Sequence, residues 1–195
     1  MKNAPLLNDL LTKGAILGGV MLLANVAEVA LASRATLGLV MLSGLIAVVS
    51  WVAFCYLSYR FTKNYDQVMI DSYEGLISFT YVNGVAYVVT VSMLAGVISS
   101  LGSYIFLHHI IGYETYINAY IKLINDMLSQ AHLPESMVGV YDEMVRNLKS
   151  QPVPTLLTSI YSGVMIYSIF GLVAGLIIAI FTRRKSVLID NNSDE

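Results

Sequence analysis

Two long stretches of this chain contain no charged side chain. Residues 75–113 run for 39 positions without an Asp, Glu, Lys or Arg, and residues 150–182 do so for 33. A helix or strand on the surface of a water-soluble domain needs polar or charged residues on the face that meets water. Runs of this length therefore fit a chain whose surface faces lipid. The sequence predicts an integral membrane protein.

Composition supports the same class and limits the size of the protein. Hydrophobic residues make up 56% of the 195 positions and charged residues 12%, whereas a soluble domain carries about one-quarter charged residues. The length suits a single membrane domain over residues 1–195. The formal charge of −2 favours no nucleic-acid partner. The single cysteine, Cys55, leaves no partner for an intramolecular disulfide.

Four apolar segments are long enough to cross a bilayer. The hydrocarbon core is about 30 Å thick, so a spanning helix needs about 20 residues. The expected spans cover residues 13–33, 36–59, 79–107 and 155–182. The sequence therefore predicts an all-α fold, an integral membrane four-helix bundle.

The first span has an alternative interpretation. Residues 30–32, Ala-Leu-Ala, resemble the small-residue site at which a signal peptide is cleaved, and a signal peptide would also explain the apolar run. The region before this span is long, however, and it carries Asp9 between Lys2 and Lys13. A retained first span is the favoured interpretation.

The basic residues set the expected orientation. Four spans place both termini on one side of the membrane, and that side carries seven of the eleven Lys and Arg residues. They are Lys2, Lys13, Arg60, Lys63, Arg183, Arg184 and Lys185. Positive charge close to the ends of spans marks the cytoplasm. We therefore expect both termini to be cytoplasmic.

The two longer connecting regions are expected to be helical. Residues 60–74 mix charged and aromatic residues, which fits a short interfacial helix followed by a turn at Gly75. Residues 110–153 lie on the extracytoplasmic side, and apolar residues recur there at steps of three or four on both sides of Pro134, as in amphipathic helices. They are Ile117, Ile121, Ile124, Leu128 and Ala131, then Met137, Tyr141, Met144, Val145 and Leu148. The sequence predicts two amphipathic helices between spans three and four.

Small residues recur at four-residue spacing on three spans. They are Gly14 and Gly18 on span one, Ser92, Gly96 and Ser100 on span three, and Gly171 and Gly175 on span four. This spacing lets two helix backbones approach closely, so that dispersion and weak polar contacts replace the hydrophobic drive that lipid does not provide. Two alternatives stay open: packing within this one bundle, or homo-oligomerisation or docking of a protein partner through these faces.

Aromatic residues mark two levels of the membrane. Trp51, Tyr56 and Tyr59 approach the expected cytoplasmic end of span two, where they are expected to form an interfacial belt. Tyr87 and Tyr167 fall deeper in their spans. Their hydroxyls are expected to bond to a neighbouring helix or to water.

Four ionisable residues are the functional candidates. Glu28 lies in span one, where such a side chain is costly and often functional, although it could also sit at the headgroup level and pair with Arg34. His108 and His109 end span three, and Glu114 follows them. Adjacent helical residues point about 100° apart, and no third ligand is spaced to join the two histidines. The sequence therefore predicts no metal site.

No motif for catalysis or cofactor binding is present. The chain lacks H-E-x-x-H, C-x-x-C, G-x-S-x-G, a Walker loop and G-x-G-x-x-G, so no catalytic residue and no cofactor are predicted. Spans three and four carry no ionisable group except the terminal histidines. Transport through a single copy of the chain is therefore disfavoured, whereas a pore in an oligomer stays open.

Three stretches carry a resemblance to a known family. They are residues 72–79 (SYEGLISF), residues 97–105 (VISSLGSYI) and residues 171–181 (GLVAGLIIAIF), the last followed by Arg183-Arg184-Lys185. With the four-span frame, they resemble a family of small inner-membrane proteins of Bacteroidota, catalogued as domain of unknown function 4199. The resemblance implies a bacterial inner membrane, no assigned activity, and a membrane-associated glycosyltransferase of the polyprenyl-phosphate type as a candidate partner, because relatives are often encoded beside one.

Three functions follow as hypotheses. The favoured one is a non-enzymatic membrane subunit or scaffold that docks or positions a partner protein. The second is an oligomeric channel or small-solute carrier that uses Glu28 and the polar residues of span three. The third is a lipid-handling enzyme at the outer interface, which requires that His108, His109 or Glu114 converge in a cleft.

Overall fold

The computed structural model describes residues 4–72, 79–131 and 135–183, and every element in them is a helix. The elements are α1 (Ala4–Ala32), α2 (Leu37–Ser72), α3 (Tyr81–Ile105), the π-helical segment η1 (Phe106–Ile111), α4 (Tyr113–Ala131), α5 (Glu135–Ser150) and α6 (Leu156–Thr182). Four helical stretches are long and apolar enough to span a membrane: Leu6–Ala32, Leu37–Met69, Tyr81–Ile111 and Leu156–Thr182. The predicted all-α membrane bundle is confirmed.

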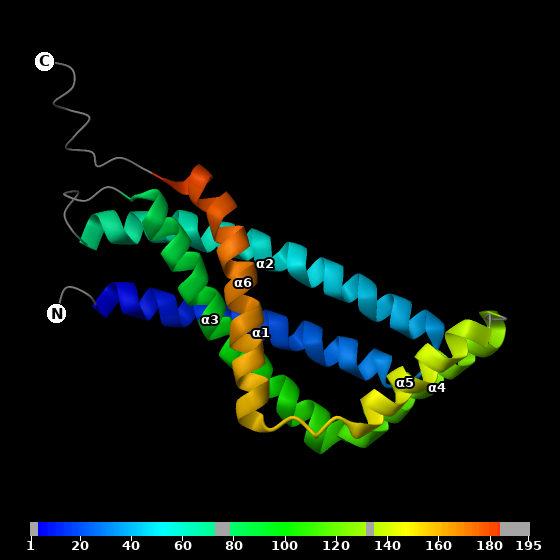
Figure 1. Cartoon of the computed structure of the whole chain (residues 1–195). Coiled ribbons are helices and arrows are strands. Elements are labelled where there is room, and N and C mark those ends of the chain that lie inside the picture. The colour runs from blue at the N-terminus through cyan, green and yellow to red at the C-terminus, as the bar shows by residue number, and fades with distance from the viewer. Residues whose placement is uncertain (1–3, 73–78, 132–134, 184–195) are drawn as a thin grey trace, which may run out of the picture.

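The spanning helices form two crossing pairs. α3 and α6 make the most extensive helix contact, and α1 packs against both α3 and α2. Figure 1 shows α1 and α2 running side by side, with α3 and α6 crossing them. Contacts of α2 with α3 and α6 are much fewer. One side of the bundle is therefore loosely closed.

Threonine side chains begin two of these helices. Thr80 lies in an extended conformation before α3, and its hydroxyl accepts a hydrogen bond from the Asn83 N–H at 3.3 Å. Thr155 does the same before α6, accepting from the Thr158 N–H at 3.2 Å. Such caps satisfy N–H groups that a helix start leaves without a partner. Both starts lie within two residues of the predicted boundaries.

The small residues predicted from the sequence lie at helix contacts inside the chain. A Cβ atom added at Gly18 would lie 2.9 Å from Ile98 Cβ, and one added at Gly171 would lie 2.6 Å from Ser92 Cβ. Gly14 also faces α3, and Gly96, Ser100 and Gly175 lie between α3 and α6. These faces are therefore occupied by intramolecular packing, and a partner or second copy would need another surface.

The deep tyrosines bond as expected to neighbouring helices. The Tyr87 hydroxyl on α3 donates to the Asp9 carboxylate on α1 at 2.8 Å. The Tyr167 hydroxyl on α6 lies 3.2 Å from the Ser99 hydroxyl on α3. Each bond joins two helices that the sequence separates by more than 65 residues. In lipid these polar contacts add specificity to close packing.

The expected interfacial helix after span two is wrong as a separate element. α2 continues without interruption to Ser72, well past residue 59. Nothing between residues 45 and 72 is Gly or Pro, so nothing breaks a helix once it has formed. Tyr65 also stacks on Tyr87 of α3 with ring centroids 4.0 Å apart, which holds this extension against the bundle. The turn expected at Gly75 lies outside the described residues.

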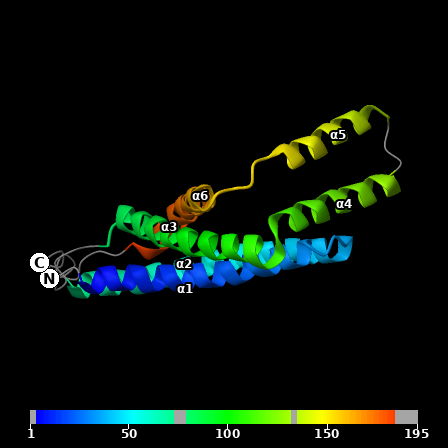
Figure 2. The ribbon, with the colours of Figure 1, turned by 90° about the horizontal axis from the view of Figure 1, so that it is seen from below.

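The segment between α3 and α6 contains the two predicted amphipathic helices. Gly112, at a φ of +87°, ends η1 and starts the turn into α4. Figure 2 shows α4 and α5 beside one another, extending away from the bundle as a hairpin. Ile121 and Leu123 of α4 are buried, whereas Val140 and Met144 of α5 are exposed. α4 therefore has buried apolar residues, whereas α5 presents exposed ones.

Adjacent glycines of α1 provide a test of the close packing. Gly18→Ala is expected to lower the free energy of unfolding by about 1–3 kcal/mol, because the added methyl group overpacks the α1 and α3 contact. Nothing lies within 4 Å of a Cβ at Gly19, so Gly19→Ala should be neutral or raise stability by up to about 1 kcal/mol. Thermal unfolding in detergent, followed by circular dichroism, measures both. Equal stability of the two variants would contradict the packing.

Candidate functional site

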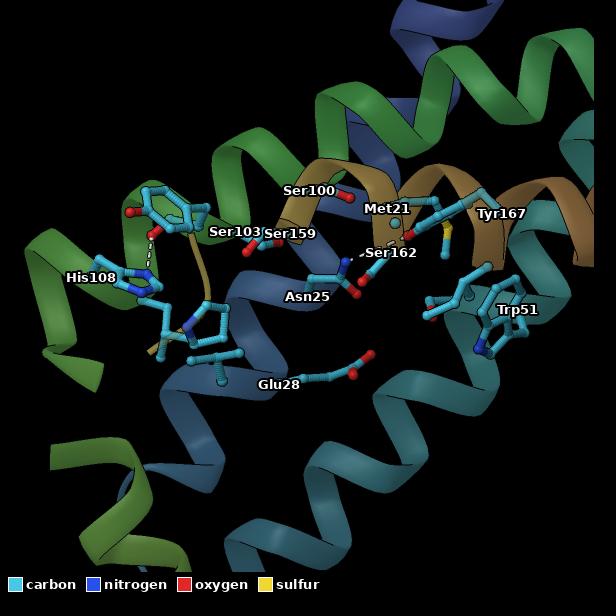
Figure 3. Close-up of a pocket in the computed structure, with 17 residues that line it drawn as sticks. Met21, Asn25, Glu28, Trp51, Ser100, Ser103, His108, Ser159, Ser162 and Tyr167 are labelled. Carbon is cyan, nitrogen blue, oxygen red and sulfur yellow. Dashed lines mark hydrogen bonds between the residues drawn. The ribbon is translucent and has the colours of Figure 1, made fainter. Parts of the chain in front are cut away.

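A half-open cavity of about 420 Å³ lies among the spanning helices at the end of the bundle next to the hairpin. Its walls come from the second half of α1, the middle of α2, the end of α3 with η1, and the first half of α6. Figure 3 shows the side chains that line it. We call it the Glu28 cavity. It forms where the few contacts of α2 with α3 and α6 leave space.

Glu28 is a half-buried residue of α1 whose carboxylate extends into this cavity (Figure 3). Within the described residues it makes no hydrogen bond, and no ion pair joins it to Arg34. The pairing with Arg34, one alternative from the sequence, is therefore not present among the described residues. A carboxylate at this depth keeps its charge only with water or a partner near it, and the cavity provides room for either.

His108 lies at the end of the cavity opposite Trp51 in Figure 3. Its Nδ1 lies 3.0 Å from the Tyr104 carbonyl oxygen. A carbonyl oxygen only accepts hydrogen bonds, so Nδ1 carries the proton. Nε2 is buried and has no hydrogen-bond partner in the structure. The ring is held between Tyr104, at 4.0 Å, and Tyr113, at 5.5 Å, so Nε2 is a positioned acceptor in the neutral side chain.

His108 and His109 lie in a π-helical turn and face different surroundings. The Gly112 N–H bonds to the Leu107 carbonyl at 2.9 Å, five residues back. Neighbouring residues of a helix point about 100° apart. His108 lines the cavity, whereas His109 is exposed and does not.

Serine hydroxyls supply most of the other polar groups in the wall. Ser100 and Ser103 come from α3, and Ser159 and Ser162 from α6. The Ser103 Oγ is buried and has no hydrogen-bond partner in the structure. An unpaired buried hydroxyl costs about 1–3 kcal/mol. The cavity therefore holds a second polar atom whose bonding capacity is unused.

A satisfied polar network forms the back of the cavity. The Asn25 side-chain amide donates to Ser99 Oγ at 2.8 Å and to the Tyr167 hydroxyl at 3.4 Å. Ser99 is fully buried and Tyr167 nearly so. The network joins α1, α3 and α6 through three residues, so it holds together the helices that carry the cavity.

Trp51 has a place in the structure that the sequence did not predict. It lies near the middle of α2 rather than at its end, because α2 runs to Ser72. Its ring lines the Glu28 cavity and stacks on Phe170 of α6 with centroids 4.0 Å apart. A lone tryptophan in an apolar helix gives no sequence signal that separates these two positions.

The remaining candidates lie apart from this site. Glu114 lines a different pocket of about 290 Å³ within the hairpin, together with Lys149. His109 is exposed. His108, His109 and Glu114 therefore do not converge in one cleft, which was the condition for a lipid-handling enzyme built on them. Among the described residues, no group of three His, Cys, Asp or Glu could hold a metal ion.

Burial affects one titrating group near the cavity but outside the spans. Tyr116 on α4 is half-buried. Burial, and then its neighbours Tyr120 and Glu28, raise the pKa of the Tyr116 hydroxyl above its ordinary value. It therefore stays a protonated donor at neutral pH.

A second, smaller cavity lies at the opposite end of α1 and α3. Its volume is about 310 Å³, and Leu6, Tyr65, Asn83 and Tyr87 are among its lining residues. The Tyr87 hydroxyl is already bonded to Asp9. Buried apolar residues of the core separate the two cavities along the bundle. They include Leu17, Phe54, Val88 and Val91.

The fold and the apolar spans define the class of this protein: a small integral membrane protein with four spanning helices and a helical hairpin between the last two. Over residues 12–184 the chain matches the family described as "Protein of unknown function (DUF4199)". This match covers most of the chain, so the protein belongs to that family and the resemblance is confirmed. No curated protein and no solved structure matches the chain.

Two serines one helical turn apart provide a stability test of the site. Ser103→Ala removes an unpaired buried hydroxyl, so we expect it to raise the free energy of unfolding by about 1 kcal/mol. Ser99→Ala removes the hydroxyl that bonds Asn25 and Tyr167, so it should lower stability by about 0.6 kcal/mol. Thermal unfolding of both variants in the same detergent gives the comparison. A loss of stability for Ser103→Ala would show that its hydroxyl has a structural partner.

Proposed function

We propose that this chain is a membrane protein that binds a small polar or amphipathic ligand in the Glu28 cavity. One observation carries the proposal. Ser103 Oγ and His108 Nε2 are buried without partners, and both residues line the same cavity as the carboxylate of Glu28. The Glu28 carboxylate extends into the cavity (Figure 3), whereas a ligand would reach the other two atoms once their side chains turn toward it, and bonding would then recover the free energy that their burial costs.

Contrast with the bonded network at the back of the cavity supports this proposal, although the Ser58 hydroxyl on α2 is also buried without a partner outside the cavity. The Asn25, Ser99 and Tyr167 network is mutually bonded and joins three helices, so its polar groups serve the fold. The free polar groups of the cavity join no helices. Polar residues in a membrane interior are costly and are retained where they serve a pathway or a ligand. Half-open cavities with a few convergent polar groups are where small ligands bind.

The proposal is closest to the small-solute carrier considered from the sequence, but it is more limited. Transport would need the ligand to pass the apolar core between the two cavities, which includes Phe54 and Val88. Binding from one side needs no such path. We place the cavity in the extracytoplasmic half of a bacterial inner membrane, with both termini cytoplasmic, because most basic residues near the spans lie at the opposite end.

Retained ligand in the purified protein tests the proposal. Native mass spectrometry of the wild type, released from nanodiscs, should show a bound small molecule or lipid. Glu28→Gln should reduce the occupancy of the bound molecule at least about fivefold, because a hydrogen bond to a charged group contributes about 1.5–3 kcal/mol. Glu114→Gln, in the hairpin pocket, is the matched control and should retain the wild-type occupancy. Identical spectra for all three proteins, or no bound molecule in any, would count against ligand binding.

The projecting hairpin supports a second proposal, the scaffold favoured by the sequence. α4 and α5 extend from the bundle (Figure 2), and Val140 and Met144 present exposed apolar side chains on α5. The candidate partner is the membrane-associated glycosyltransferase that the family resemblance implies. Exposed apolar residues next to a membrane protein's spans are suited to docking a partner.

Co-purification tests this second proposal. A membrane-associated glycosyltransferase of the polyprenyl-phosphate type, carrying an affinity tag, should retain the wild type in mild detergent. Val140→Asp with Met144→Asp should reduce retention at least about tenfold, because charges would be buried in an apolar contact. Gly139→Ser is the control, because open space surrounds this exposed α5 residue. Equal retention of all three proteins, or no retention of the wild type, would exclude docking through this face.

A further inference from the structure

We infer that the ligand of the Glu28 cavity carries an organic ammonium group. The inference rests on the proposed ligand binding and names the chemistry that the cavity would recognise. Three features of the wall support it: the sign of its charge, the direction of its hydrogen bonds, and its aromatic rings.

The charge of the wall is negative. Seventeen residues line the cavity, and Glu28 is the single Asp or Glu among them, with no Lys or Arg in the lining. A carboxylate in a low-dielectric site attracts a cation and repels an anion far more strongly than in water. A phosphate or carboxylate group in this cavity would meet uncompensated repulsion. The cavity therefore favours a cation.

The free polar atoms of the wall accept hydrogen bonds. His108 uses its Nδ1–H on the Tyr104 carbonyl, so the unpartnered Nε2 has a lone pair to offer. The Ser103 hydroxyl is also unpartnered and can accept. A primary ammonium group supplies up to three N–H donors and no acceptor. It could therefore bond to the Glu28 carboxylate in the cavity, and to the Ser103 hydroxyl or the His108 imidazole once that side chain turns toward it.

The aromatic rings favour an organic cation over a metal ion. Trp51, Tyr104 and Tyr167 line the cavity, and aromatic faces attract ammonium groups within about 6 Å. A divalent metal would instead need several oxygen or nitrogen ligands. The described residues contain no group of three His, Cys, Asp or Glu suited to that. A volume of about 420 Å³ also leaves space for a small organic molecule.

Such an ammonium group has two sources. It could be the headgroup of phosphatidylethanolamine, entering from the bilayer through the open side of the cavity, or a water-soluble amine, entering from the extracytoplasmic end. Both present the same N–H donors and the same charge to Glu28. The experiment therefore has separate arms for the two.

Cysteine labelling measures the charge preference directly. In a Cys55→Ser background, Ser159→Cys places one thiol in the cavity wall, and Asn147→Cys places one on the exposed surface of α5. Each full-length protein, in phosphatidylglycerol nanodiscs, reacts with ethyl methanethiosulfonates that carry either a trimethylammonium or a sulfonate group. Rates at residue 159 are divided by those at residue 147, which cancels intrinsic reactivity and the surface charge of the bilayer.

A cavity that selects cations gives a defined result. The normalised rate of the cationic reagent should exceed that of the anionic one by about tenfold, as expected for one carboxylate in a partly desolvated site. Glu28→Gln should reduce this preference to near one, whereas Glu28→Asp, which keeps the charge, and the control Glu114→Gln should retain it. Glu28→Asp also controls for misfolding, because it changes the same residue but keeps the charge and should keep the preference.

Two further arms identify the source. Replacing part of the phosphatidylglycerol by phosphatidylethanolamine should slow labelling at residue 159 severalfold if the lipid headgroup is the ligand. Soluble ethanolamine should slow labelling at residue 159 severalfold if the ligand enters from water. Slowing by neither amine, or equal normalised rates for the two reagents, would overturn the ammonium inference and leave ligand binding intact. Failure of both reagents to reach residue 159, while residue 147 reacts, would overturn the proposed function as well.

Discussion

The architecture depends on the close approach of α3 and α6. Lipid supplies no hydrophobic drive between helices, so these two are held by backbone contact at small residues such as Gly96 and Gly171. That approach brings the Tyr167 hydroxyl to Ser99, and Asn25 of α1 completes the bond network. α2 has no such residues against this pair and packs on it sparsely. The Glu28 cavity is the space that this asymmetry leaves.

Two sets of polar side chains in the bundle differ in their bonding. One set is mutually bonded and joins helices: Asn25 with Ser99 and Tyr167, and Asp9 with Tyr87. The other set consists of Glu28, Ser103 and His108, which line the Glu28 cavity and are only partly bonded. The first set stabilises the fold. Lipid contains no water to bond to these polar groups, so each group is satisfied by its protein partner instead. The second lowers stability unless something binds to it, which is why the proposals here concern this cavity.

Local patterns predicted much of the fold and less of the site. Helix number, the amphipathic hairpin and the bonding of the deep tyrosines follow from hydropathy and periodicity, which depend on near neighbours in sequence. The continuation of α2, the place of Trp51 and the free Nε2 of His108 were missed. The continuation of α2 could have been predicted from the lack of a helix breaker in the sequence. The others depend on a π turn and on crossing helices, which have no local signal.

The sequence by itself determined that this chain lives in a membrane and crosses it four times, because charge-free runs of more than 30 residues have no other stable environment. It also identified Glu28 and His108 among the functional candidates. Only the tertiary structure decided that these two share one cavity while Glu114 and His109 do not. Residues 80 positions apart in the chain meet only when helix packing, set by backbone approach at glycines, brings their helices together.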